Sequence, residues 1–351
     1  MEALAKLTGV TNIWVHRERV MRDLFKTYEN SKEITQHLAS FSFHGEAGMD
    51  LDGLKREAYS LFWKQALEDY FEGSSTFVPR VGPDIEESTM RTLGRIISHQ
   101  YILTGIFPVH INRAFMVATL CGRQALSDED LLEAFLEYIS ENESHELRAI
   151  LAQSEQGELS GESCEFLVDF FSDYQVTKRP LASNLKAILV RVAKNELLSK
   201  PAMAMDGMRD GLLDGDFVNL WKCSKDDVMN IYKAMQLTPQ RVISMLSEDP
   251  STHLHKSRLQ IFSYLKKYIR CLSRNELGRF LSYVTGTPIP VVESIQVMFH
   301  VNELGSLPHP LTHTCAASID LPDSGYASFN DFRVQMDALL SNERSWKFTS
   351  L

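Results

Sequence analysis

A lone cysteine lies in the stretch LPHPLTHTCAASIDLP, residues Leu307 to Pro322, where prolines interrupt any helical period. Cys315 follows His313 by two residues. Such a thiol can be a buried small hydrophobic group, a metal ligand or a nucleophile. In an extended segment side chains alternate between two faces, so we expect His313 and Cys315 to point the same way and Thr314 the opposite way. A protonated imidazole beside the thiol would favour the thiolate, which is the nucleophilic form.

The spacing argues against two of the possible chemistries. A metal site could use His309, His313 and Cys315, but the sequence offers no clear fourth ligand and no second Cys/His cluster. A papain-like hydrolase has its histidine after the cysteine, and no histidine follows Cys315 here. A structural thiol and a nucleophile of another kind remain open, and we predict no metal site.

The elements around the cysteine predict a small α+β domain. A helix is expected over 257–272, followed by ELGRFLSYVTGTPIP with a turn at Gly286 and by the strand candidate IQVMFHV. After the cysteine segment, SFNDFRVQMDALLSN predicts a helix with Ser328 as its N-cap. The tail then carries Trp346 and Phe348 beyond any helical stripe.

The stretch SEDPSTHLHKS predicts a boundary, because it is polar, contains a proline and precedes a new helix. We place a large domain over 1–249, a flexible hinge at 250–255 and a small domain over 256–351. His253 and His255 could form a metal pair, but two histidines in a polar linker are more often solvated.

The large domain is predicted to be mainly helical. Its first 80 residues are expected to form helices over Trp14 to Tyr28 and Ala58 to Phe71, around a glycine-rich turn. Further helices are expected at DEDLLEAFLEYI and CEFLVDFFSDY. The methionines of AMAMDGMRDGLL are expected in the core: Met203, Met205 and Met208.

Composition excludes several classes of partner. The formal net charge of -10 and the pI near 5.6 argue against nucleic acid, and they favour a protein partner with a basic face. No signal peptide and no apolar window of membrane-spanning length is present. The five cysteines are single and odd in number, so reduced thiols and a cytosolic or nuclear compartment are expected.

Taken together, the motifs resemble the HECT ubiquitin-ligase family. LPHPLTHTCAASIDLP is similar to the family signature of LP, a short gap, TC and a later DLP, and ELGRFLSYVTG is similar to its FVTG segment. Phe348 is fourth from the end, where the family keeps a phenylalanine. Upstream, FHGEAGMDLDGLKREAYSLF and LGRIISHQYILTGIFPVHI resemble the opening of the family's large lobe. The motifs agree in order and distance across nearly the whole chain.

The resemblance implies a bilobal α+β fold, with a large helical N-lobe that docks a ubiquitin-loaded conjugating enzyme and a small C-lobe that bears the cysteine. Cys315 would accept ubiquitin as a thioester and pass it to a substrate lysine. His313 would poise the thiol, Thr314 would shape the loop or donate a hydrogen bond, and Asp320 would hold the loop or orient the incoming amine. Phe348 would matter for lysine transfer more than for loading.

Three departures from the family pattern bear on this interpretation. Ala316 replaces a bulky residue, Asp52 replaces a glycine, and residues 126–185, where conjugating-enzyme docking is expected, match poorly. The alternative is a catalytically inactive interaction module with a HECT-like fold. The presence of both Cys315 and Phe348 argues against it, because a scaffold has no physical need for that pair.

Overall fold

The structure is a computed structural model that describes residues 7–30, 32–46, 52–248, 255–301 and 309–341. The chain divides into two compact units. Unit 1 comprises Met1–Lys64, Gln100–Ile106 and Ala234–Leu351, and unit 2 comprises Gln65–His99 and Phe107–Lys233. Three helices pass from one unit to the other: α2 (Gly53–Tyr70), α3 (Glu87–Thr104) and α11 (Lys225–Ala234). The bounds of these two units differ from those of the lobes predicted over 1–249 and 256–351. The two lobes therefore remain a prediction.

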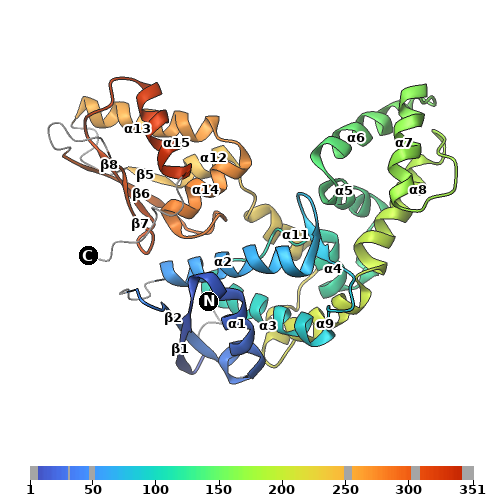
Figure 1. The fold of residues 1–351 in the computed structure, drawn as a ribbon, viewed down its shortest axis with the longest axis horizontal. Helices are drawn as coiled ribbons and strands as arrows, with labels where there is room; N and C mark the ends of the chain where they lie inside the picture. Colours follow the sequence, from blue (N-terminus) through green and yellow to red (C-terminus); the bar gives the residue numbers. More distant parts are fainter. Residues whose placement is uncertain (1–6, 31, 47–51, 249–254, 302–308, 342–351) are drawn as a thin grey trace. The chain divides into compact units, whose positions relative to one another are not determined.

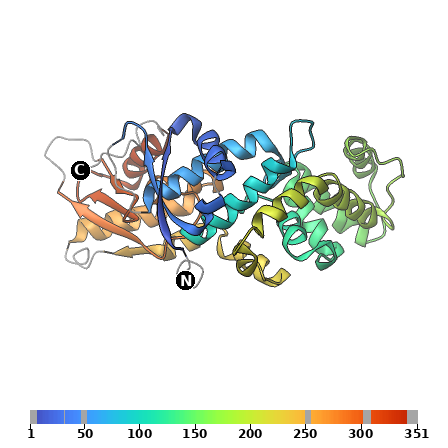
Figure 2. The same ribbon diagram turned by 90° about the horizontal axis from the view of Figure 1, so that it is seen from below.

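Unit 1 begins with two parallel strands, β1 (Gly9–Val15) and β2 (His37–Phe43), which run side by side in both views (Figure 1; Figure 2). Between them lie two short 3-10 turns and helix α1 (Val20–Asn30). The helix predicted over Trp14 to Tyr28 is confirmed from Val20 onward, but its predicted start was wrong because Trp14 and Val15 belong to β1. In GVTNIWV and HLASFSF the buried side chains alternate with more exposed ones toward the end of each strand, which is the period of a half-buried strand.

Helices α1, α2 and α3 bury polar side chains in pairs inside unit 1. The Tyr28 and Tyr59 hydroxyls lie 2.8 Å apart, and both side chains are fully buried. Trp63 Nε1 donates to Gln100 Oε1 at 2.6 Å. Because a buried polar group is costly without a partner, these pairs specify how the helices meet. They hold the first turns of α2 in a defined place.

The C-terminal part of unit 1 is a four-stranded sheet with helices on one face (Figure 1). The strand order is β5-β6-β8-β7, in which only the β7–β8 pair is antiparallel. The strands and helices are α12 (Pro239–Met245), β5 (Leu246–Glu248), α13 (Lys256–Cys271), α14 (Arg274–Thr285), β6 (Ile295–His300), β7 (Leu311–His313), β8 (Ser318–Pro322) and α15 (Phe329–Ser341). The strand predicted at IQVMFHV and the helices predicted near 257–272 and after Ser328 are confirmed, and so is the α+β class.

The core of this sheet follows from the period of two in its strands. Ile295 and Val297 of β6, with Ile319 and Leu321 of β8, are buried against the helices. The opposite face of β8 carries Ser318, Asp320 and Pro322. The sheet thus has an apolar face that holds the helices and a second face with polar side chains.

Helix α14 ends at a left-handed glycine. Its N-terminus is a capping box in which Ser273 and Glu276 bond reciprocally to each other's backbone N–H. At its C-terminus Gly286 has φ +78°, and its N–H donates to the Ser282 carbonyl. The turn predicted at Gly286 is confirmed.

Unit 2 is mainly helical, with one short antiparallel hairpin. Its elements are β3 (Phe71–Gly73), β4 (Phe77–Pro79), α4 (Arg113–Cys121), α5 (Asp128–Tyr138), α6 (Glu141–Glu155), α7 (Gly161–Asp173), α8 (Leu185–Lys194), a π-helical turn (Asn195–Ser199), α9 (Ala202–Leu212) and α10 (Phe217–Leu220), with a 3-10 turn at Arg123–Ala125. A Cβ added at Gly211 of α9 would lie 1.8 Å from the Arg91 carbonyl oxygen, so only glycine allows α9 to approach α3 this closely.

The methionine prediction was right for two residues of three. Met205 and Met208 are buried in unit 2, whereas Met203 is 51% exposed. Positions 205 and 208 are three apart and share a helix face, while 203 lies on the turn that faces solvent. The predicted hinge at 250–255 lies outside the described residues except for His255, which immediately precedes α13.

Candidate active site

Cys315 lies in the tight turn of the β7–β8 hairpin. The last paired residues are His313 and Ser318, and residues 314–317 form the connection. Ala316 N–H donates to the His313 carbonyl at 3.0 Å, and Ala317 N–H donates to the Thr314 carbonyl at 3.3 Å. These bonds hold the thiol at the tip of a hairpin, where it is exposed. A short turn of this kind gives a nucleophile both a fixed backbone and access to a large partner.

The turn closes on a strained alanine. Ala317 has φ +47°, in the left-handed region that residues with a Cβ rarely adopt. Its carbonyl accepts a hydrogen bond from the Gln296 N–H of β6 at 3.0 Å. The sheet therefore holds a conformation that alanine alone would disfavour by about 1–2 kcal/mol.

Exposed and buried residues alternate around the thiol as predicted, although the extended backbone ends at His313. His313 and Cys315 are exposed, whereas Thr314 is buried, with 4% of its surface accessible. The expectation of one extended segment was wrong because the chain turns from Thr314 to Ala317. His313 holds the turn through its backbone carbonyl, which leaves its imidazole outside the turn's hydrogen bonds.

Asp320 lies on β8, opposite Leu311 of β7 and Met298 of β6. Its Oδ1 atom lies 3.1 Å from Nδ1 of His300, the last residue of β6. This partner was not singled out in the sequence. The period of two in IQVMFHV puts His300 on the polar face of the sheet, but the strand order that brings it beside Asp320 could not be known from local pattern.

A second missed residue is Arg56, in the first turns of α2. Its Nη2 atom donates to the Thr314 carbonyl at 2.7 Å, and its Nε atom donates to the Thr285 carbonyl at 2.8 Å. All three residues belong to unit 1. Arg56 lies within a stretch that the resemblance had already marked, GEAGMDLDGLKRE, but no local signal connects it with a turn 258 positions away.

The other sequence predictions concern metals, the tail and the membrane. Among the described residues, no group of three or more His, Cys, Asp and Glu side chains is arranged to hold a metal ion. Phe348 lies outside the described residues. No helix in the described part of the chain is long and apolar enough to cross a membrane. All five cysteines are free thiols.

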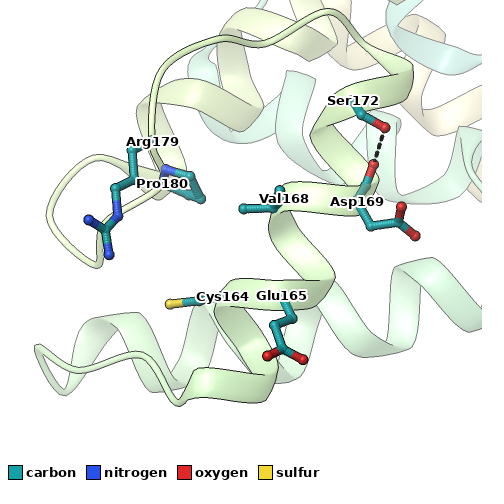
Figure 3. A pocket seen from close by; sticks show the side chains of 7 residues that line it. All are labelled: Cys164, Glu165, Val168, Asp169, Ser172, Arg179 and Pro180. Carbon is teal, nitrogen blue, oxygen red and sulfur yellow. Dashed lines mark hydrogen bonds between the residues drawn. The ribbon is translucent and has the colours of Figure 1, made fainter.

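Region 126–185, where docking of a conjugating enzyme was expected, has its aromatic residues largely in the core of unit 2. Phe135, Phe170 and Phe171 are buried and form a chain of ring contacts with Tyr174. A pocket of about 420 Å³ opens beside α7 (Figure 3). It is lined by Cys164, Glu165, Val168, Asp169, Ser172, Arg179 and Pro180. Val168 is 61% exposed, so this pocket offers an apolar contact within a charged rim.

Comparison with known proteins decides the family. The family model described as HECT-domain (ubiquitin-transferase) matches residues 53–349. The chain belongs to the HECT family. Over the described residues, this HECT match includes α2 with Arg56, the turn with Cys315 and β8 with Asp320.

Two curated HECT-related ligases are similar to most of the chain. The probable E3 ubiquitin-protein ligase TOM1 of Eremothecium gossypii is 22% identical over 369 residues, which cover 94% of this chain and 11% of the relative. The E3 ubiquitin-protein ligase TOM1 of Saccharomyces cerevisiae is 22% identical over 355 residues, covering 92% and 10% respectively. The chain thus spans about a tenth of the length of these relatives.

Proposed function

We propose that this chain is a HECT-type ubiquitin ligase whose nucleophile is Cys315. The observation that carries the proposal is the exposed thiol at the tip of a short hairpin, in a chain that belongs to the HECT family. A structural cysteine is usually buried, whereas this one is presented to solvent by a turn that is held at several backbone atoms.

The proposed reaction has two steps. Ubiquitin first moves from the thioester on the conjugating enzyme to a new thioester on Cys315, and then from Cys315 to a substrate lysine. The Cys315 thiolate attacks the carbonyl carbon of the thioester that joins ubiquitin to its conjugating enzyme. A C–S bond to Cys315 forms, the old C–S bond breaks, and the conjugating enzyme leaves as a thiolate. The amine of a substrate lysine then attacks the new thioester, loses a proton and forms an isopeptide bond as the Cys315 thiolate leaves. No cofactor is required, because the energy of the thioester is supplied before ubiquitin reaches this chain.

The supporting residues keep the roles that the resemblance implies. His313 would poise the thiol from the exposed end of β7. Buried Thr314 would shape the turn, and Asp320, 3.1 Å from His300, would orient the incoming amine or hold the loop. Phe348 would promote transfer to lysine, so a Phe348→Ala chain should load normally and discharge slowly; unchanged discharge would contradict this role.

The proposed partners are ubiquitin, a conjugating enzyme and protein substrates. We also propose a cytosolic or nuclear location, because five free thiols are typical of a reducing compartment. The competing function is an inactive interaction module, which would bind a conjugating enzyme without any covalent adduct on Cys315.

The test is to mix the purified chain with ubiquitin-charged conjugating enzymes and to compare it with Cys315→Ser and Cys315→Ala on non-reducing gels. We expect an adduct that reductant removes in the native chain, an adduct that resists reductant with serine, and no adduct with alanine. If a folded native chain binds charged conjugating enzymes but forms no adduct with any of a broad panel, the interaction module is favoured instead.

A further inference from the structure

One side of the first two turns of α2 contacts the turn that carries Cys315. Gly53, Arg56 and Ser60 follow one another at spacings of three and four, so they share one face of the helix. Arg56 donates to the Thr285 and Thr314 carbonyls. The Ser60 hydroxyl donates to the Arg56 carbonyl at 2.8 Å, and its Oγ also lies 3.2 Å from the Gly286 carbonyl oxygen. We call this face of α2, residues Gly53, Arg56 and Ser60, the seat.

Arg56 joins two backbone segments, the end of α14 and the start of the turn that carries Cys315. Thr285 is the last residue of α14, where the carbonyls lack partners within the helix and carry the negative end of its dipole. The Thr314 carbonyl also accepts the Ala317 N–H of the tight turn. Since hydrogen bonds from a charged donor are stronger than neutral ones, the planar guanidinium fixes the end of α14 and the start of the turn together.

Two glycines allow the seat to come this close. A Cβ added at Gly53 would lie 2.8 Å from Cys315 Sγ and 2.9 Å from Cys315 N, distances that a real side chain does not adopt. A Cβ added at Gly286 would lie 3.1 Å from the Gly53 carbonyl oxygen. The start of α2 therefore lies directly against one side of Cys315, and Cys315 is still exposed to solvent.

We propose that this seat positions the thiol of Cys315 for ubiquitin transfer and that Arg56 is the positioning residue. The inference rests on the proposed function and extends it to α2. Arg56 acts through the Thr314 carbonyl, one residue before the proposed nucleophile. Small misplacements of a reacting group can slow a reaction by orders of magnitude. Loss of the Arg56–Thr314 hydrogen bond should therefore slow ubiquitin transfer strongly even in a chain that remains folded.

The first experiment tests the contact itself and needs no ubiquitin. Iodoacetamide alkylates exposed thiols, and peptide mapping of timed samples gives the alkylation rate at Cys315 separately from the four other cysteines. Because α2 lies against one side of Cys315, displacing it with Arg56→Ala or Gly53→Ala should raise the alkylation rate at Cys315 by about threefold or more. Lys64→Ala, an exposed change on the same helix, is the matched control and should leave that rate unchanged. Native alkylation rates in folded Arg56→Ala and Gly53→Ala chains would overturn the seat.

The second experiment measures discharge of ubiquitin from loaded Cys315 to free lysine, which requires no docking of the conjugating enzyme at that stage. We expect Arg56→Ala to slow discharge by at least about tenfold. Arg56→Lys should fail to restore it, because a single ammonium group does not reproduce the planar fork. Lys64→Ala, an exposed change on the same helix, should discharge at the native rate.

The outcomes separate this inference from the proposed function. Native discharge by a folded Arg56→Ala chain, or full rescue by lysine, would overturn the positioning role. If no variant ever loads ubiquitin, the proposed function fails, while the alkylation experiment still decides whether α2 lies against Cys315.

Discussion

At the scale of single residues, His313 can be tested without disturbing the turn. Its backbone carbonyl, which alanine keeps, accepts the Ala316 N–H. The imidazole is exposed, and interactions between exposed charges are worth about 1 kcal/mol or less. We therefore expect His313→Ala to load ubiquitin about two- to fivefold more slowly, measured by quenched-flow gels with a charged conjugating enzyme. Loading at the native rate would remove the poising role.

The residues of the site were predictable to different degrees. Cys315, His313 and Asp320 stand in one continuous signature, so sequence alone brought them to attention. His300 and Arg56 did not, because each reaches the hairpin from another element: β6 lies beside β8 through the strand order, and Arg56 lies 258 positions before Thr314. Local periodicity carries no information on such pairings.

At the scale of elements, the end of α14 makes a prediction about stability. Gly286 has φ +78°, and a Cβ there would also approach the Gly53 carbonyl oxygen. Gly286→Ala should lower the free energy of unfolding by about 1–2 kcal/mol from the left-handed conformation, with a further loss from the close approach.

Gly45→Ala is the matched control for that change. Gly45 also has a positive φ, +82°, but a Cβ there would meet no atom of the described residues within 4 Å. Urea midpoints of the two variants should therefore both fall, with the larger drop for Gly286→Ala. Equal drops would show that the approach to Gly53 adds nothing.

The elements also show where sequence patterns succeed. α15 and β6 were predicted because a cap, a helical stripe or a short β-rich run marks each of them. β1 and β2 were missed because their outer faces carry apolar side chains: Val10 and Trp14 are 65% and 55% exposed. Exposed apolar residues blur the alternation that identifies a half-buried strand, and GVTNIWV then resembles the start of the helix that follows.

At the scale of the whole molecule, loading requires a contact for the conjugating enzyme as well as a thiol. The docking region was expected within residues 126–185, and Val168 is the exposed apolar side chain beside its pocket (Figure 3). We expect Val168→Asp to raise the conjugating-enzyme concentration for half-maximal loading by about five- to tenfold, since a carboxylate buried without a partner in a protein contact opposes binding.

Val218→Asp provides the control for Val168, because Val218 is another exposed valine of unit 2, at 42%. It should leave the loading curve unchanged, and discharge of the loaded chain to free lysine should be native in both variants. A native loading curve for Val168→Asp would place the docking contact elsewhere.

The bond between Arg56 and Thr314 also constrains how the chain is made. Ribosomes add about 5–20 residues per second, so the 258 positions between these two residues correspond to roughly 13–50 s of synthesis. For that time the start of α2 has emerged without the turn that it contacts. All of unit 2 is encoded between the two and can fold as it appears, whereas unit 1 is complete only when its last segment has been made. The face of α2 formed by Gly53, Arg56 and Ser60 therefore stays without the turn that it contacts until the C-terminal segment of the chain has been made.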